Sequence, residues 1–144
     1  MSQENVDFVR GLLDGAVEMD KQAILAALPE LLPEAFTEDA EWIEDPQRAD
    51  RQVWRGHDGI CESWRRWLDQ WDEYGFDVTA IEDHGEKVFV ATREEGRGSA
   101  SGAAVVADNY MVLSFREGKI ARYEEFYDEA RARAALGEAA PPTN

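Results

Sequence analysis

The spacing of apolar residues changes once along this chain of 144 residues, and this change constrains the fold more than any other feature. In the first half, residues such as Val6, Val9 and Leu13 recur at intervals of three and four, which is typical of amphipathic helices. From Phe76 onward, apolar and polar residues alternate, which is typical of half-buried strands. Helices followed by consecutive hairpins predict an α+β fold.

The expected elements form a single domain over residues 1–136, followed by a flexible C-terminal tail over residues 137–144. Pro29 and Pro33 are expected to break the second helix, because proline lacks the N–H that a helix interior needs. Gly96, Gly98 and Gly102 predict a bulge or a strongly bent stretch. After the second helix we expect a strand at 41–45, a polar loop at 47–54, a helix at 57–72, strands that begin near 76, 87, 103 and 119, and a closing helix at 128–136. A bent antiparallel sheet wrapped around three N-terminal helices makes a cone-shaped α+β barrel, whose mouth can hold a small ligand.

The net charge of the chain limits the classes of molecule that it is expected to bind. The chain has 15 basic and 31 acidic residues, a formal net charge of −16, which argues against binding to nucleic acid or to an anionic membrane surface. A single cysteine, Cys61, and two isolated histidines predict no metal site, and the absence of a glycine-rich phosphate loop predicts no nucleotide cofactor. The first residues have neither a basic nor an apolar stretch typical of a secretory signal, so we expect a cytoplasmic protein.

Three segments, Phe36–Trp42, Trp54–Ile60 and Glu117–Tyr123, resemble the nuclear transport factor 2-like superfamily, and its SnoaL-like (polyketide-cyclase-like) branch most closely. They are similar to the Phe-x-x-Asp-Ala/Val-x-Trp start of the first strand, the Arg-Gly-x-x-x-Ile start of the third helix and the Gly-Lys-Ile hairpin before the last strand. The resemblance implies the cone fold, and a homodimer across the outer face of the sheet. It leaves the function open, because the superfamily contains isomerases, hydrolases, cyclases, dehydratases and non-catalytic binding domains.

Glu44 and Asp45 are the first candidate catalytic residues. Ketosteroid isomerases of this superfamily carry a catalytic aspartate before a proline, and the resemblance of Glu44-Asp45-Pro46 to that triplet favours Asp45. Counting forward from Asp39-Ala40 instead puts Glu44 in the position of the base. Because side chains alternate along a strand, only one carboxylate is expected to face the cavity, where burial would raise its pKa. The alternative is that Asp45-Pro46 ends a strand and that Glu44 is solvated.

Arg93, Glu95 and Glu125 are the second set of candidates. Epoxide hydrolases of the superfamily use an arginine between two aspartates, and these three residues occupy similar places in the sequence. The resemblance implies that Arg93 bridges Glu95 and Glu125, keeps one carboxylate ionised and lets the other hold a proton. The alternative is a structural ion pair across neighbouring strands.

Aromatic and apolar residues on the third helix and on the strands are expected to line the cone, with only one of each adjacent pair facing inward. These residues are Trp42, Trp64, Trp67, Phe89, Tyr110, Met111 and Tyr123. We therefore expect an acid/base enzyme without a cofactor, of the isomerase, cyclase, dehydratase or epoxide-hydrolase type, that acts on a small hydrophobic oxygenated molecule. The alternative is a non-catalytic ligand-binding or dimeric scaffold domain of the same fold. A cavity carboxylate with a raised pKa would favour the enzyme.

Overall fold

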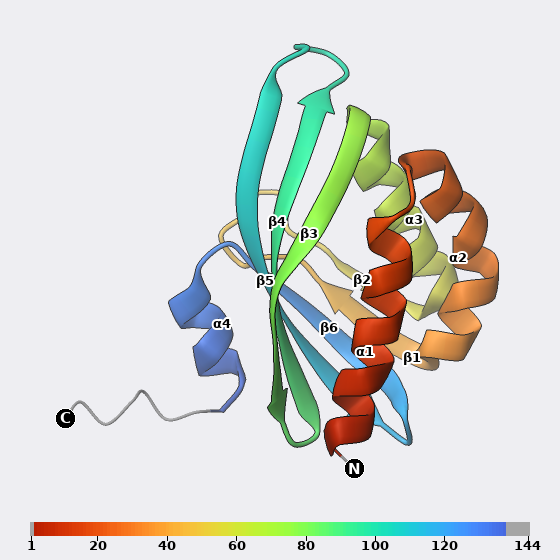
Figure 1. Ribbon diagram of the computed structural model, residues 1–144, viewed down its shortest axis with the longest axis vertical. Coiled ribbons are helices and arrows are strands. Elements are labelled where there is room, and N and C mark those ends of the chain that lie inside the picture. The colour runs from red at the N-terminus through yellow and green to blue at the C-terminus, as the bar shows by residue number, and fades with distance from the viewer. Residues whose placement is uncertain (1, 138–144) are drawn as a thin grey trace.

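A computed structural model describes residues 2–137, and the chain in this range forms helices and strands of an α+β fold (Figure 1). The N-terminal part contains α1 (Ser2–Val17), α2 (Lys21–Ala35), β1 (Phe36–Ile43), β2 (Val53–Arg55) and α3 (Gly56–Asp69). The hairpins that follow contain β3 (Trp71–His84), β4 (Lys87–Gly98), β5 (Ala104–Arg116) and β6 (Lys119–Phe126), and α4 (Glu129–Ala135) closes the fold. Of the predicted tail at 137–144, residues 138–144 lie outside the described residues.

The strands form a curved, unclosed sheet in the order β2-β1-β6-β5-β4-β3. The hairpin strands pair antiparallel as predicted, but β1 pairs in parallel with β6, from Phe36 opposite Ile120 to Ile43 opposite Glu124. The expectation of a wholly antiparallel sheet is therefore wrong for this pair. Parallel neighbours need a long connection, and here α3 and the hairpins supply it. The sheet keeps two edges, β2 and β3, so the cone is not a closed barrel.

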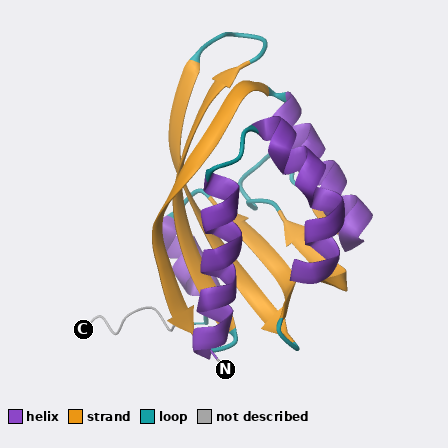
Figure 2. Cartoon of the chain, turned by 45° about the vertical axis from the view of Figure 1, so that its right-hand side comes forward, coloured by secondary structure: helices purple, strands orange, loops and turns teal. Residues whose placement is uncertain are grey.

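The helices cover the two faces of the sheet unequally. In the turned view of Figure 2, α1, α2 and α3 lie against the concave face and α4 lies on the opposite face. The main core lies on the concave side and includes Val9, Leu28, Ile60, Val90 and Leu113. A smaller core under α4 contains Phe89, Ala91, Val112, Phe126 and Ala132. Within residues 2–137, no helix has both the length and the apolar character that a bilayer crossing requires.

Helix α2 runs through both prolines, so the predicted break is wrong. Asp20 caps it by accepting a hydrogen bond from the N–H of Ala23 at 2.8 Å. Pro29 and Pro33 are four residues apart and exposed, so both lie on the solvent side of the helix. Water can reach the carbonyl groups that lose their helical N–H partners there, and the buried side of the helix stays intact.

The boundaries of α3 and β3 also differ from those predicted. Trp71, which the predicted helix at 57–72 includes, begins β3 instead, and its ring meets the ring of Trp67 edge-on at 5.5 Å. The predicted polar loop at 47–54 ends in the short strand β2. The pairing of β4 with β5 runs without a register shift, so the predicted glycine bulge is absent there, but the pairing with β3 shifts beside Gly98, which lies opposite Trp71. The irregularities lie between β3 and β4, at Trp71–Glu73 and Val78–Ala80.

Candidate functional site

A cavity of about 230 Å³ lies on the concave side of the sheet, beside the loop that joins β1 to β2 and the C-terminal half of α3. Indole and phenol rings form one part of its wall, and charged, amide and hydroxyl side chains form most of the rest. Trp42 and Tyr123 stack with ring centroids 3.6 Å apart, and Trp64 meets Trp42 edge-on at 5.6 Å. Of the aromatic and apolar residues predicted to contact a ligand, Trp42, Trp64, Trp67, Met111 and Tyr123 line this cavity.

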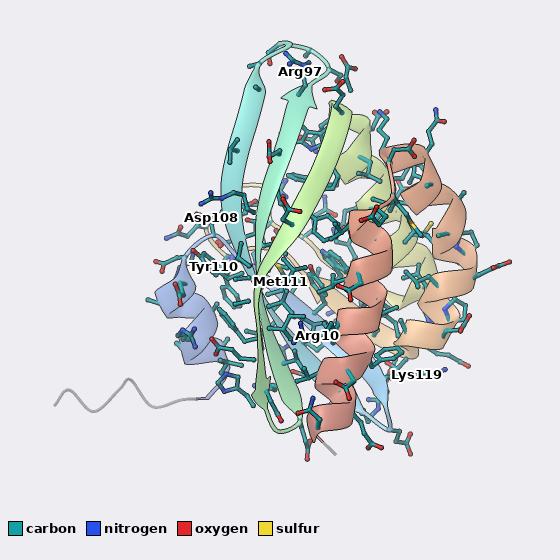
Figure 3. The ribbon with its side chains drawn as sticks, viewed as in Figure 1. Arg10, Arg97, Asp108, Tyr110, Met111 and Lys119 are labelled. Carbon is teal, nitrogen blue, oxygen red and sulfur yellow. The ribbon has the colours of Figure 1, made fainter. Side chains whose placement is uncertain are left out.

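Phe89 and Tyr110 do not line the cavity. They stack on each other at 6.2 Å within the smaller core under α4, so the expectation that they face the cone is wrong. Tyr110 and Met111 are adjacent on β5 and therefore point to opposite faces of the sheet (Figure 3). Only Met111 reaches the cavity.

Two glutamates, Glu94 on β4 and Glu125 on β6, line the cavity. Burial and then the negative charge of Glu94 raise the pKa of Glu125 to about 7, and the charge of Arg48 offsets only part of this rise. Atom Oε1 of Glu125 is buried and has no hydrogen-bond partner in the described part of the chain. Burial also raises the pKa of Glu94, although hydrogen bonds from Asn109 and Tyr74 partly oppose that rise.

The two carboxyl groups influence each other, so they titrate as a pair. Neither makes an ion pair within 4.0 Å in residues 2–137. The phenols of Tyr74 and Tyr123 stay protonated, because burial raises the pKa of both. Near neutral pH the cavity therefore offers a carboxyl group that can give a proton, one that can take a proton, and phenol groups that can donate hydrogen bonds.

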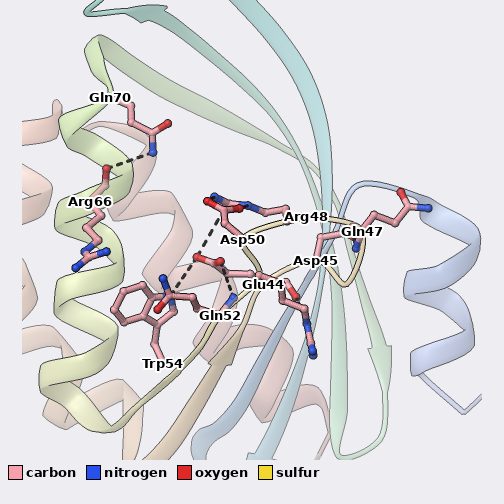
Figure 4. A network of polar contacts seen from close by, with 10 residues as sticks. Glu44, Asp45, Gln47, Arg48, Asp50, Gln52, Trp54, Arg66 and Gln70 are labelled. Carbon is pink, nitrogen blue, oxygen red and sulfur yellow. Dashed lines mark hydrogen bonds and ion pairs between the residues drawn. The ribbon is translucent and has the colours of Figure 1, made fainter.

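Glu44 also lines the cavity, but it is held in place by the β1–β2 loop (Figure 4). Its carboxylate accepts hydrogen bonds from the backbone N–H of Gln52 at 3.1 Å and from the indole N–H of Trp54 at 3.0 Å. The guanidinium of Arg48 lies 3.7 Å from the same carboxylate. Both oxygens of Glu44 are thus engaged, and its main effect here is to fix the loop that forms the rim.

Asp45 is fully buried and does not line the cavity. It accepts hydrogen bonds from the backbone N–H groups of Gln47 and Tyr127, each at 2.6 Å, and from the guanidinium of Arg131 at 2.9 Å. Burial alone would raise the pKa of Asp45, but these hydrogen bonds outweigh burial and lower it. Asp45 therefore ties the β1–β2 loop to the start of α4.

Arg93 and Glu95 lie on the convex face of the sheet, away from Glu125. Arg93 pairs with Asp108 at 3.1 Å, and its side chain is 56% exposed. The predicted bridge from Arg93 to Glu95 and Glu125 is therefore wrong, because Arg93 and Glu95 alternate with Glu94 along β4. Glu94 was not among the candidate residues predicted from the sequence, although it lies between Arg93 and Glu95, which were.

Comparison with known proteins supports this fold. Residues 10–123 match the family described as the SnoaL-like domain. A candidate SnoaL-like polyketide cyclase from Jannaschia sp. CCS1 is 18% identical, with a TM-score of 0.70 over 98% of this chain and 95% of that one. An NTF2-like protein of unknown function from Burkholderia pseudomallei K96243 is 19% identical, with a TM-score of 0.68 over 94% and 98%.

A third structure, a candidate isomerase of the SnoaL-like family from Agrobacterium tumefaciens strain C58, is 20% identical, with a TM-score of 0.62 over 88% of this chain and 98% of that one. At such identities the likeness shows the fold alone. No curated protein matches this chain in sequence.

Proposed function

The chain belongs to the SnoaL-like domain family, and from that premise we propose that it is an acid/base enzyme that needs no cofactor and acts on a small hydrophobic oxygenated molecule. The observation that carries this proposal is the pair Glu94 and Glu125 in one cavity with aromatic rings in its wall, with the pKa of Glu125 raised to about 7. A buried carboxyl group with such a pKa is half protonated near neutral pH, the condition under which general acid and general base catalysis are most effective.

The hydrogen bonds support a different role for each carboxyl group. Asn109 and Tyr74 donate to Glu94 and favour its ionised form, so Glu94 acts as the base that removes a proton from carbon or from water. Glu125 lacks such support at Oε1, so it holds the proton and gives it to the substrate oxygen. One negative charge is present before and after the transfer, and the proton moves between the substrate and the pair.

The aromatic part of the wall supports a substrate with a flat apolar face, and the polar part supports at least one oxygen on it. The rings of Trp42, Trp64 and Tyr123 offer flat apolar surface, and the cavity volume of about 230 Å³ suits a molecule of one or two rings. An oxygen of the substrate is needed to accept the proton from Glu125. Isomerisation, cyclisation and dehydration all need this combination of base, acid and apolar surface.

The proposal is tested on a simple carbon acid. Wild-type protein is incubated with 2-tetralone in D₂O, and proton NMR follows exchange of the hydrogens next to the carbonyl group. Glu94→Gln and Glu125→Gln are each expected to lower the protein-catalysed exchange rate about 100-fold or more. The matched control is Glu95→Gln, which changes the neighbouring carboxylate on the convex face and should leave the rate unchanged.

The dependence of this rate on pH provides a second readout. Since Glu125 is the proton donor, the exchange rate should fall above pH 7 as its carboxyl group ionises. Equal rates for wild type, Glu94→Gln and Glu125→Gln would contradict the proposal. That result would favour the second candidate, a non-catalytic binding domain, which the fully engaged carboxylate of Glu44 also suits.

A further inference from the structure

A second hollow of about 280 Å³ lies between the sheet and the helices α1 and α2. Its walls are largely apolar and include Leu12, Leu13, Leu28, Phe76 and Leu113. The residues that it shares with the cavity of the glutamate pair are Trp42, Trp64, Tyr74, Glu94, Met111 and Tyr123. The hollow is therefore a neighbour of the acid/base site, and Glu94 lies in the boundary between them.

The wall of this hollow contains one buried hydroxyl group without a hydrogen-bond partner in the described residues, that of Thr92. Thr92 lies on β4, is 2% exposed and lines the hollow, but it does not line the cavity of the glutamate pair. Its Oγ1 atom is buried and has no hydrogen-bond partner in the described residues. A buried hydroxyl group without a partner lowers the stability of a folded protein, and valine has the same shape without that penalty.

We propose that the hydroxyl group of Thr92 forms a hydrogen bond with an oxygen of the bound ligand, while the apolar part of that ligand occupies the hollow under α1 and α2. This inference rests on the proposed function, because it describes the far end of the same substrate. A ligand in the hollow satisfies the otherwise unpartnered Oγ1, which explains why a threonine stands where the packing needs only a valine.

The distance between Thr92 and Glu94 also limits how far apart the two oxygen atoms of the substrate can lie. They are two residues apart on β4 and face the same side of the sheet, so their backbones are about 7 Å apart. The substrate then carries two oxygen functions at opposite ends of an apolar ring system. One oxygen lies at the pair Glu94 and Glu125, and the other lies at Thr92.

Two inert probes test this inference without any turnover. Calorimetry measures the binding of 2,6-dihydroxynaphthalene, which has a hydroxyl group at each end, and of 2-naphthol, which has only one. Wild-type protein should bind the first about fivefold to tenfold more tightly, the effect of one neutral hydrogen bond. Thr92→Val should abolish this preference, while Thr92→Ser, which keeps a hydroxyl group, should retain it.

Thermal unfolding of the same variants separates a ligand contact from a structural contact. If Oγ1 has no partner in the free protein, Thr92→Val should keep the melting temperature or raise it by about 2–4 °C. The inference is overturned if Thr92→Val keeps the preference for the second hydroxyl group, if it lowers the melting temperature, or if neither probe binds to the wild type. The exchange of 2-tetralone reports separately on the proposed function, so the two failures are distinguishable.

Discussion

The glutamate pair shows how the same residue type takes different roles within one small site. Glu44 has hydrogen-bond donors at both oxygens, whereas Oε1 of Glu125 has none in the described residues. Burial raises the pKa of Glu125, and the nearby charge of Glu94 raises it further. Burial beside a second carboxyl group, with no donor at Oε1, thus keeps the carboxyl group of Glu125 able to hold a proton near neutral pH.

The raised pKa of Glu125 predicts a specific change in stability with pH. Its pKa is about 7 in the folded protein against an ordinary value of 4.5, so the folded state binds more protons between these values and stability falls as pH rises through them. Glu125→Gln removes this loss, and should raise the free energy of unfolding by up to about 3 kcal/mol at pH 8 and by little at pH 4.5. Urea unfolding at both pH values measures the difference.

The exposed residue Glu95 supplies the control for this experiment. Glu95→Gln should change the free energy of unfolding by less than about 0.5 kcal/mol at either pH. A Glu125→Gln variant that is as stable as the wild type at pH 8 would show that the carboxyl group of Glu125 ionises without penalty in the folded protein.

Asp45 leads to the opposite prediction, because its negative charge stabilises the fold. Asp45→Ala leaves Arg131 and two backbone N–H groups without their acceptor, and should lower the free energy of unfolding by about 3 kcal/mol. Asp50→Ala, in the same loop and 76% exposed on its side chain, should change it by less than about 0.5 kcal/mol. Equal urea midpoints for the two variants would refute the structural role of Asp45.

The sequence predicted the correct segments for these residues, but on β4 it indicated Arg93 and Glu95 rather than Glu94, which lies between them and lines the cavity. Alternation places Glu44 and Asp45 on opposite sides, and in the structure only Glu44 lines the cavity. The face of Glu94 was harder to predict, because both faces of β4 are buried over the five residues 88–92 that lead to it. Val88 and Val90 pack in the main core while Phe89 and Ala91 pack under α4, so the hydrophobic pattern does not distinguish the two faces.

At the scale of elements, the sequence predicts the order of helices and hairpins well, because each depends on local spacing. The observed elements differ from the predicted ones where contacts with the rest of the fold or with solvent decide the structure. The prolines of α2 face solvent, which the local sequence does not reveal. Trp71 lies outside α3, although the predicted helix included it, because β3 begins at this residue. The parallel contact of β1 with β6 joins Phe36 to Ile120, a long-range pairing that no local pattern encodes.

The contact between β3 and β4 depends on a glycine. A Cβ atom at Gly96 would lie 2.6 Å from Cε3 of Trp71, whose ring also meets Trp67, so Gly96→Ala forces a rigid indole to move. We expect a loss of about 1–3 kcal/mol in the free energy of unfolding. Gly75→Ala on the neighbouring strand meets no atom within 4 Å and should instead stabilise the protein by about 0.5–1 kcal/mol.

Urea unfolding of the two glycine variants measures both effects, and near-ultraviolet circular dichroism reports on the indole environment of Trp71. A Gly96→Ala variant with wild-type stability and an unchanged aromatic spectrum would show that the indole ring adapts without strain.

At the scale of the whole molecule, two helical layers of different size pack against the two faces of the sheet. The three N-terminal helices enclose the main core, and α3 alone of them lines the cavity of the glutamate pair. Helix α4 and the Asp45 contact close the opposite face. The cavities therefore lie on the side where the sheet curves and the helices span it, and the convex side carries packing and exposed ion pairs such as Arg93 with Asp108. This division places cavity-lining side chains and packing or surface side chains on alternate residues of the same strand.

The net charge of −16 affects the molecule as a whole and predicts how salt changes its stability. Like charges repel each other more in the compact state than in the unfolded chain, and exposed ion pairs recover little of this energy. Raising the ionic strength from 0.01 to 0.1 M shortens the screening length from about 30 Å to about 10 Å, so the melting temperature should rise by a few degrees. Sodium chloride and potassium chloride should act alike, because the effect is screening rather than the binding of one cation. A melting temperature that falls with salt would show instead that local attractions between opposite charges outweigh the repulsion.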